Sequence, residues 1–413
     1  MRTRYLFVTQ YFPPERGAAQ VRLGAVTSEL TRRGGQVDVL TAIPNYPTGR
    51  LFPGWSRRPI QTSTEAGVRV RRVWVWAAMG SGPGRLANFV SFGLMSVLGL
   101  VRERAADITV VEYPTLFGAL PAVIWCRARR RTVVVNVADL WVDASVAVGA
   151  LPDGALVRVL LHIERWMLLQ ADAVNAVTEG VRDALIAKGV DPDRICWLPN
   201  GADTHLFSPG AADEADRARL GLEVGVHLFV YAGTHGYVHG LDVVLDAAER
   251  LRDAPVRILL VGGGSERQRL REIARARGLD NVTFWDPVDP EHVARLLRLA
   301  TAGLACTRKG DLYKSIRSAK VLPIMATGKP VLYSGDDEGA ALVASIGAGM
   351  QLPPGDGNAL AEAILAVIAD PEMAASMGER GRAHVLETAS WEVIVERWLD
   401  DLDQVLHASP AAA

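Results

Sequence analysis

The feature that most constrains the fold of this chain is a regular alternation of short β-branched segments with longer amphipathic segments. Such alternation is typical of parallel sheets that are covered by helices on both faces. It continues through 413 residues, which is too long for one ordinary hydrophobic core and suggests two domains of about 150 to 200 residues each. We therefore expect an α/β protein built from two doubly wound domains in tandem.

A charged, alanine-rich segment, "SPGAADEADRARLGLEV", divides this pattern into two halves. We assign an N-terminal domain, a linker, a C-terminal domain and a final helix that packs back on the N-terminal domain to residues 1–205, 206–224, 225–388 and 389–408, respectively. Ligands bind at the carboxyl ends of the strands in doubly wound domains. We therefore expect the two sets of strand ends to face each other across a central cleft that holds a shared site.

The charge balance and the positions of possible metal ligands exclude several functions. Lys and Arg total 45 against 46 for Asp and Glu, so no net positive field attracts nucleic acid, and we predict no nucleic-acid partner. Cys126, Cys196 and Cys306 stand far apart and are predicted to be buried, reduced thiols. His235 and His239 lie four residues apart without a suitable third ligand, so we predict no metal site.

The amino end and one uncharged segment bear on where the protein is located. The start, "MRTRYLFVTQYFPPE", has only a brief apolar run and no cleavage site, which indicates a first strand in a cytoplasmic protein. Residues 86–101 carry no charge and lie between Arg85 and Arg102. Because this segment is shorter than the about 20 residues that span a bilayer, two alternatives remain: a buried helix, or peripheral contact with the inner face of a membrane.

Two polar loops follow predicted strands in the N-terminal half. Gly17, in "QYFPPERGAA", precedes a predicted helix, so its loop could hold an oxyanion or a sugar hydroxyl, or could form only a tight turn. The loop lacks the GxGxxG spacing of a dinucleotide site. Tyr46 and Arg50, in "IPNYPTGR", lie in a loop that is well placed to contact a second substrate.

Two aspartates follow the fifth predicted strand, in "NVADLWVDASVAVGALP". Asp139 could orient or deprotonate a substrate hydroxyl, or could cap the helix that follows. Trp141 and Asp143 lie on the same segment. We include them with Tyr46 and Arg50 as candidates for contact with the second substrate.

Glycine-rich loops follow the first two predicted strands of the C-terminal half. In "YAGTHGYVHGLD", Gly233 lets the backbone approach a ligand, while His235 and His239 offer donors that are cationic only if their pKa values are raised. In "VGGGSERQRL", Gly263 repeats this arrangement, and Glu266 stands at the helix start, where it could also meet a ribose or a base. These loops are candidates for a nucleotide site.

The lysines gather in one short stretch of a chain that otherwise uses arginine. The chain contains only five lysines, and four of them lie between residues 309 and 329, together with Arg308 and Arg317. Lys320 lies at the start of a predicted helix in "SAKVLPIMATG". Because a compact ammonium group at a helix N-terminus is suited to phosphate oxygens, we predict a phosphate site here, with a solvated basic loop as the alternative.

Seven segments, in register, resemble glycosyltransferases of the large family 4, and in particular the branch that assembles bacterial polysaccharides. They are "VTQYFPPERGAA", "IPNYPTG", "DLWVDASVAVGAL", "AVTEGVRDALIAKGV", "LPNGADTHLFSP", "YAGTHGYVHGLDVVLDAA" and "MATGKPV". The resemblance covers nearly the whole chain and implies the GT-B fold of two Rossmann-like domains. It implies a retaining hexosyl- or aminodeoxyhexosyltransferase that uses a nucleotide sugar, UDP or dTDP linked, without an obligatory metal or other cofactor. The implied acceptor is a glycan, a lipid-linked glycan or a small molecule.

The resemblance also implies roles for individual residues. Lys320 matches the lysine that contacts the donor diphosphate, and Arg317 and His239 are expected to help it stabilise the leaving group. Gly233 matches the glycine after the first strand of the donor domain, and Val288 lies where backbone contacts often read the base. Asp139 is the expected residue for orienting the acceptor hydroxyl.

Several positions depart from the family pattern. Pro323 occupies the helix position at which the family has an acidic residue that binds the donor ribose. Ser315 occupies the position of the upstream residue that is the partner of this acid in the family pattern. Ala138 replaces a His or an Arg. Pro323 is also expected to remove a backbone donor and to bend the first turns of its helix. Two alternatives to an active transferase therefore remain: a non-catalytic member that serves as a partner subunit of another transferase, and a sugar-nucleotide epimerase or glycosyl phosphorylase on the same fold.

Overall fold

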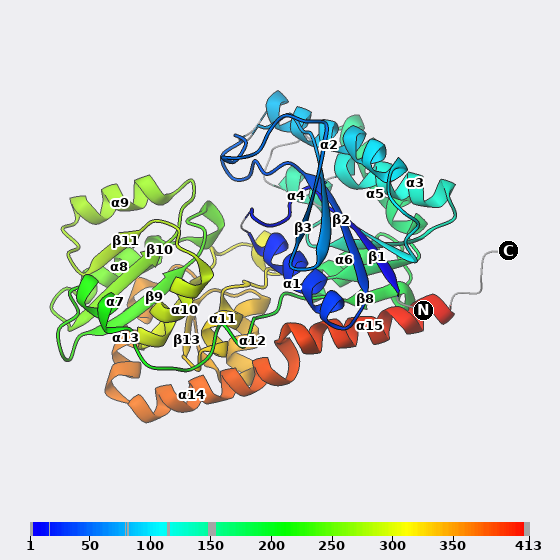
Figure 1. The fold of residues 1–413 in the computed structure, drawn as a ribbon. Coiled ribbons are helices and arrows are strands. Elements are labelled where there is room, and N and C mark those ends of the chain that lie inside the picture. Colours follow the sequence, from blue (N-terminus) through cyan, green and yellow to red (C-terminus); the bar gives the residue numbers. More distant parts are fainter. Residues whose placement is uncertain are drawn as a thin grey trace. The chain divides into compact units, whose positions relative to one another are not determined.

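The computed structural model describes residues 3–15, 17–78, 80, 82–113, 116–147 and 154–408. The chain forms two compact units. Unit 1 consists of Met1–Asn200 together with Ile394–Ala413, and unit 2 consists of Gly201–Val393. Each unit is a largely parallel sheet covered by helices (Figure 1), so the predicted α/β architecture of two doubly wound domains is confirmed.

Unit 1 contains an eight-stranded sheet in the order β3-β4-β2-β1-β5-β6-β7-β8, in which only β3 and β4 pair antiparallel. The strands are β1 (Arg4–Val8), β2 (Gln36–Ala42), β3 (Ile60–Glu65), β4 (Val68–Val73), β5 (Ile108–Glu112), β6 (Thr132–Val137), β7 (Ala173–Ala176) and β8 (Ile195–Trp197). The helices are α1 (Ala18–Arg32), α2 (Pro83–Val101), α3 (Leu116–Ala128), α4 (Trp141–Ala147), α5 (Ala155–Gln170), α6 (Glu179–Ala187), η1 (Pro192–Arg194) and α15 (Trp391–Ala408).

Unit 2 contains a six-stranded parallel sheet in the order β11-β10-β9-β12-β13-β14. The strands are β9 (His227–Ala232), β10 (Val256–Val261), β11 (Val282–Trp285), β12 (Ala302–Cys306), β13 (Val331–Ser334) and β14 (Gly349–Leu352). The helices are α7 (Glu214–Arg219), η2 (Tyr237–His239), α8 (Asp242–Arg250), α9 (Arg267–Ala276), α10 (Pro290–Leu299), η3 (Asp311–Tyr313), α11 (Val321–Ala326), α12 (Glu338–Ile346), α13 (Gly357–Ala369), α14 (Pro371–His384) and η4 (Val385–Ala389).

The residue patterns explain which strands lie at the centre of each sheet. The central strand β6, "TVVVNV", is buried at every position after its first residue. Such an unbroken apolar run is typical of a parallel strand that helices cover on both faces. The edge strand β3, "IQTSTE", has no buried residue. Its polar sequence suits an edge that faces solvent.

The strand order places one switch point in each unit. β1 lies between β2 and β5, and β9 lies between β10 and β12. The chain therefore winds in opposite directions on the two sides of β1 and of β9. Ligands of doubly wound sheets bind at the carboxyl ends of the strands at such a point.

The segment predicted to be a linker, residues 206–224, is part of unit 2. It packs on α10, because Arg298 Nε donates to the Ser208 carbonyl oxygen over 2.8 Å and His292 Nε2 lies 2.8 Å from Asp216 Oδ1. The final helix, α15, groups with unit 1 from Ile394 onward. Its fully buried Trp398 donates from Nε1 to Asn175 Oδ1 in β7 over 2.9 Å.

Candidate functional site

The loop after β9 lies at the switch point of unit 2 and packs against the loop after β10. Gly233 donates its N–H to the Val261 carbonyl oxygen over 2.9 Å, and His235 donates to the Gly263 carbonyl oxygen over 2.7 Å. Gly262 has φ 142°, and a Cβ there would lie 1.9 Å from the Gly233 oxygen. Only glycine therefore fits at position 262, and the two loops form one tight turn.

Lys320 reaches this turn from the N-cap position of α11. Its Nζ donates to Ser318 Oγ over 3.0 Å and lies 5.0 Å from the centre of the Tyr231 ring. Its Cε lies 2.9 Å from the place that a Cβ of Gly233 would occupy. Burial lowers the pKa of Lys320 to about 8. An ammonium group whose pKa lies close to neutral pH thus lies directly against the glycine loop.

His235 and His239 lie on this loop and are uncharged at neutral pH. Burial, followed by the charge of Arg267, lowers the pKa of His235 to about 4. Burial, followed by the charge of Lys320, lowers the pKa of His239 to about 3, and His239 Nδ1 lies 3.5 Å from Lys320 Nζ. As neutral rings, His235 and His239 offer hydrogen bonds, and the expectation that His239 helps to stabilise the departing diphosphate stays a prediction.

Glu266, Val288 and Arg317 lie on three different segments of unit 2. Glu266 is at the N-cap position of α9, and its Oε2 accepts a hydrogen bond from Arg269 Nε over 2.8 Å. This ion pair occupies one oxygen of the carboxylate that we expected to meet a ribose or a base. Val288 follows β11 and is half-buried against the core. Arg317 precedes α11. The pKa of His384 is lowered mainly by burial and, to a smaller extent, by the charge of Arg317.

Three of the lysines that are close in sequence have different surroundings. Lys320 precedes α11, whereas Lys329 follows its other end, where burial lowers the pKa of Lys329. Lys314 is exposed, and its Nζ lies 2.7 Å from Asp311 Oδ1. Of these three lysines, only Lys320 contacts the glycine loop.

Pro323 is the third residue of α11 and does not disturb it. The first four N–H groups of an α-helix have no partner within the helix, so a proline there removes no helical hydrogen bond. The Pro323 carbonyl oxygen accepts the Thr327 N–H over 3.1 Å at the end of α11. The proline therefore gives no reason for the first turn of α11 to bend, contrary to our expectation. The difference from the family pattern at this position is the absence of a carboxylate.

Asp139 follows β6 and lies near a buried ion pair that sequence analysis missed. Arg22 Nη2 lies 2.8 Å from Glu112 Oε1, and the side chains of both residues are almost fully buried. Arg22 Nη1 also donates to Asn200 Oδ1 over 3.0 Å. Burial raises the pKa of Asp139, and the Arg22 charge opposes this shift. α4 begins at Trp141, so Asp139 stands one residue too early to be its N-cap.

Trp141 and Asp143 are held by other side chains of unit 1. The Trp141 ring meets the Phe117 ring edge-on, with centroids 5.8 Å apart. Asp143 Oδ2 lies 2.7 Å from Lys188 Nζ, which also lies 2.8 Å from Oε1 of the buried Glu164. Both residues therefore have structural contacts that the sequence did not indicate.

Glu15 joins the two loops that carry Gly17 and Tyr46. Its buried Oε1 accepts the N–H groups of Asn45 and Tyr46, both over 2.8 Å. Burial raises the pKa of Glu15 to about 7, although these hydrogen bonds oppose the shift. Gly17 directly precedes α1, and its carbonyl oxygen accepts the Val21 N–H over 3.0 Å. No local pattern marks Glu15 in the sequence, because its partners Asn45 and Tyr46 are distant in the chain.

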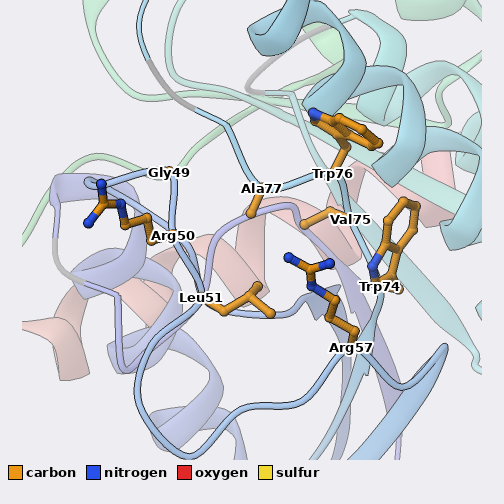
Figure 2. A pocket seen from close by; sticks show the side chains of 8 residues that line it. All are labelled: Gly49, Arg50, Leu51, Arg57, Trp74, Val75, Trp76 and Ala77. Atoms are coloured by element: carbon orange, nitrogen blue, oxygen red, sulfur yellow. The ribbon is translucent and has the colours of Figure 1, made fainter.

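Arg50 lines a pocket that is formed by the end of the Tyr46 loop, by Arg57 and by the segment that follows β4 (Figure 2). The β-branched and aromatic residues of "VRVRRVWVW" favour a strand through Trp76, but β4 ends at Val73. The Trp76 N–H donates to Ser91 Oγ on α2 over 2.9 Å. The released segment forms one wall. The pocket has a volume of about 380 Å³ and is lined by Gly49, Arg50, Leu51, Arg57, Trp74, Val75, Trp76 and Ala77.

Within the described ranges, no group of three or more His, Cys, Asp or Glu side chains could hold a metal ion. Cys126, Cys196 and Cys306 are buried, as predicted, and none is in a disulfide. Burial raises the pKa of all three thiols to about 11 or 12. These thiols are therefore poor nucleophiles.

Two family models match the chain, one in each unit. A model described as "Glycosyl transferase 4-like domain" matches residues 17–201, and one described as "Glycosyl transferases group 1" matches residues 226–370. Together they leave out only the chain ends and the segment between the two matches.

Relatives with described roles are similar over most of the chain. "Putative colanic acid biosynthesis glycosyl transferase WcaI" of Escherichia coli (strain K12) is 26% identical over 324 residues, which cover 77% of this chain and 79% of the relative. A "D-inositol 3-phosphate glycosyltransferase" of Kineococcus radiotolerans is 26% identical over 407 residues, which cover 93% of this chain and 89% of the relative.

Solved structures share the fold at lower identity. Sucrose-phosphate synthase from Thermosynechococcus elongatus has a TM-score of 0.74 at 20% identity and covers 99% of this chain and 100% of its own. Anabaena HepE, solved in complex with UDP and glucose, has a TM-score of 0.73 at 18% identity and covers 97% of this chain and 100% of its own.

Proposed function

Since the chain belongs to glycosyltransferase family 4 and has the GT-B fold, we propose that it is a retaining transferase that moves a sugar from a nucleoside diphosphate sugar to an acceptor hydroxyl. Unit 2 binds the donor, and unit 1 binds the acceptor. The donor is a UDP or dTDP sugar. The acceptor is a glycan, a lipid-linked glycan or a small molecule.

The observation that carries this proposal is the position of Lys320. Its ammonium group lies at the switch point of unit 2, against the Gly233 turn, and no described carboxylate is in an ion pair with it. When the bond between the anomeric carbon and the diphosphate breaks, negative charge develops on the diphosphate oxygen. A preorganised cation beside that oxygen lowers the barrier. A bound diphosphate would also hold Lys320 in its charged form.

In this proposal the donor itself supplies the base. The acceptor oxygen attacks the anomeric carbon on the face that the diphosphate leaves, and the departing phosphate oxygen takes the hydroxyl proton. Asp139 orients the acceptor hydroxyl, and no further protein base is required. The position of Ala138, where relatives have a His or an Arg, is compatible with such a mechanism.

UDP is the first donor base to test. The HepE structures were solved with UDP, with UDP and glucose, and with UDP-glucose. These complexes support UDP as a candidate for a chain of the same fold. The residues after β11, including Val288, are the segment that we expect to contact the base.

Slow transfer to water provides a test that does not require the acceptor. The chain is incubated with UDP-glucose or dTDP-glucose in EDTA, and released nucleoside diphosphate and sugar are measured. We expect slow release of the nucleotide, with the new sugar first appearing in the donor's anomeric configuration in NMR spectra. Release with inverted configuration, or release that needs a metal, would contradict the proposal.

Pro323 favours one second candidate, a non-catalytic partner of another transferase. The third position of α11 carries no carboxylate, and Ser315 supplies none at the upstream position. A site that holds the diphosphate but not the ribose would bind nucleotides without turning them over efficiently. Binding of UDP without any release, and activity that appears only with a second protein, would favour this candidate.

We also propose that α2 contacts a membrane surface. α2 is long and apolar enough to cross a membrane by length and composition, but Gly99 packs so closely on Leu40 that a Cβ would lie 2.5 Å from Leu40 Cδ1. Its buried face thus belongs to the core of unit 1. Its outer face exposes an apolar stripe of Leu86, Val90, Leu94, Leu98 and Val101.

Basic residues beside this stripe suit an anionic lipid surface. Arg102 and Arg104 follow α2 and are exposed. Each such residue near an anionic bilayer contributes about 1 kcal/mol. We expect the chain to float with vesicles that contain phosphatidylglycerol, and Leu94→Glu to reduce this, whereas Leu365→Glu, an exposed leucine of unit 2, should not. Equal flotation of both variants would argue against the contact.

A further inference from the structure

A buried polar cluster holds one wall of the pocket in Figure 2. Asn88, fully buried in α2, donates to the Trp76 carbonyl oxygen over 2.8 Å and to Asn45 Oδ1 over 3.2 Å. Gln10 donates to Asn88 Oδ1 over 2.7 Å. One side chain thus ties together the segments that follow β1, β2 and β4. Because the wall is fixed before a ligand arrives, binding there needs little further ordering.

The pocket combines positive charge with indole rings. In Figure 2 the Arg57 guanidinium reaches between Leu51 and Trp74, whereas the Arg50 guanidinium points away from the other labelled side chains. The guanidinium groups of Arg50 and Arg57 make no ion pair or hydrogen bond with another described residue. None of the lining residues is acidic. Arg57 therefore brings a charge into the pocket that no lining group compensates.

A neighbouring arginine shows the contrast. Arg72 is fully buried, and its guanidinium donates to Glu65 Oε1 over 2.7 Å and to the Pro13 carbonyl oxygen over 2.6 Å. The charge of Arg72 is thus compensated by Glu65 within the fold. Arg57, which is exposed on the preceding loop, is not used in this way.

These side chains specify the chemistry of a ligand. A guanidinium group binds a phosphate or a carboxylate through parallel hydrogen bonds. An indole ring offers a broad apolar face with little conformational freedom to lose. We therefore propose that this pocket binds the anionic group of the acceptor, a phosphate or a carboxylate attached to a sugar ring, with Arg57 on the anion and Trp74 beside the ring. This inference rests on the proposed function and names the class of its acceptor.

Titration of small sugars into the purified full chain tests the pocket directly. All proteins carry Lys320→Ala, so that the phosphate site of unit 2 does not contribute. Glucose 1-phosphate presents a phosphate, glucuronate presents a carboxylate, and methyl glucoside presents the same ring without charge. Binding is followed by tryptophan fluorescence, since Trp74 and Trp76 line the pocket. We expect saturation with at least one charged sugar, which identifies the anion, and no saturation with methyl glucoside.

Variants of two neighbouring arginines separate the pocket from a general charge effect. Arg57→Ala is expected to weaken binding about tenfold or more, because a charge-assisted hydrogen bond is lost. Arg57→Lys, which keeps the charge, should lose less. Arg58→Ala removes an exposed charge that does not line the pocket, and should bind like the parent.

Three results would overturn the proposal. They are no saturation with either charged sugar, equal binding of methyl glucoside, and equal losses in Arg57→Ala and Arg58→Ala. Binding of UDP to the chain that retains Lys320 is measured separately. If UDP does not bind but a charged sugar does, the proposed transfer reaction fails while the anion site remains.

Discussion

The switch points of the two units share one topology but differ in how their charges are compensated. In unit 1, Arg22 lies 2.8 Å from the buried carboxylate of Glu112. In unit 2, Lys320 lies against a glycine turn, and no carboxylate of the described residues is in an ion pair with it. A paired buried charge is a structural element, whereas an unpaired cation beside open backbone can be compensated by a ligand. The topology therefore defines two candidate crevices, and they differ in charge compensation, which is why we propose that the crevice of unit 2 accepts a diphosphate.

Removal of the paired cation should have the largest effect. Arg22→Ala leaves Glu112 buried without a partner, and we expect a loss of about 3 to 5 kcal/mol in the free energy of unfolding. Urea unfolding followed by circular dichroism measures this. Lys320→Ala should cost less than about 1 kcal/mol in the same experiment, because no carboxylate is abandoned. Equal losses of unfolding free energy in the two variants would show that the two cations do not differ in charge compensation.

The buried acid of unit 1 should give stability a distinct pH dependence. Glu15 has a pKa raised to about 7 in the folded chain, so between its ordinary pKa of 4.5 and 7 the folded state holds a proton that the unfolded state has released. This contribution is present at low pH and is lost as the pH rises through 7. Glu15→Gln stays neutral and should gain about 2 kcal/mol relative to the original chain between pH 5 and pH 8.

The unfolding free energies of both proteins, measured at several pH values, test this prediction. The two curves should diverge as the pH rises. Parallel curves would show that Glu15 titrates normally and that burial in unit 1 does not shift it.

The unpaired cation of unit 2 should make nucleotide binding fall with pH. Lys320 has a pKa of about 8, and only its protonated form attracts a diphosphate. We expect the affinity for UDP to fall about tenfold between pH 7 and pH 9, in proportion to the protonated fraction. Calorimetric titration at each pH measures the affinity. A profile of the same shape in Lys320→Ala would assign the titration to another group.

A carboxylate at position 323 should raise the affinity for UDP, and this is the smallest of the expected effects. Pro323→Glu places an acid in the first turn of α11, where the helix dipole favours it. If the ribose hydroxyls reach this position, one added hydrogen bond of about 1 kcal/mol raises the affinity for UDP about fivefold. Inorganic pyrophosphate, which has no ribose, is the control and should bind unchanged. Equal gains for both ligands would point to a general effect on the helix.

The sequence predicted the architecture well because strand burial is a local property. Runs such as "TVVVNV" are apolar at every central position, and they became central strands. The polar strand β3 was missed, since "IQTSTE" has no apolar pattern and is held only by pairing with β4. The strand-like residues continue through Trp76, but β4 ends at Val73, and the Trp76 backbone bonds instead with Asn88 and Ser91 on α2.

The sequence predicted the site only where glycines and helix starts mark it. Gly233, His239 and Lys320 were selected from such signals, and the structure brings them together. The pair of Arg22 and Glu112 was missed because its residues are far apart in the chain, and no local pattern joins them. The sequence places Lys329 close to Lys320, but α11 lies between them.

We propose that Lys320 makes unit 2 the binding site of a nucleoside diphosphate. Calorimetric titration of UDP, dTDP and ADP in EDTA tests it in the original chain, in Lys320→Ala and in Lys314→Ala, whose lysine is exposed and paired with Asp311. We predict one site that prefers one base, a loss of about tenfold or more in Lys320→Ala, and no loss in Lys314→Ala. Absence of binding by the folded chain, or equal affinity with and without Lys320, would show that Lys320 does not hold a diphosphate.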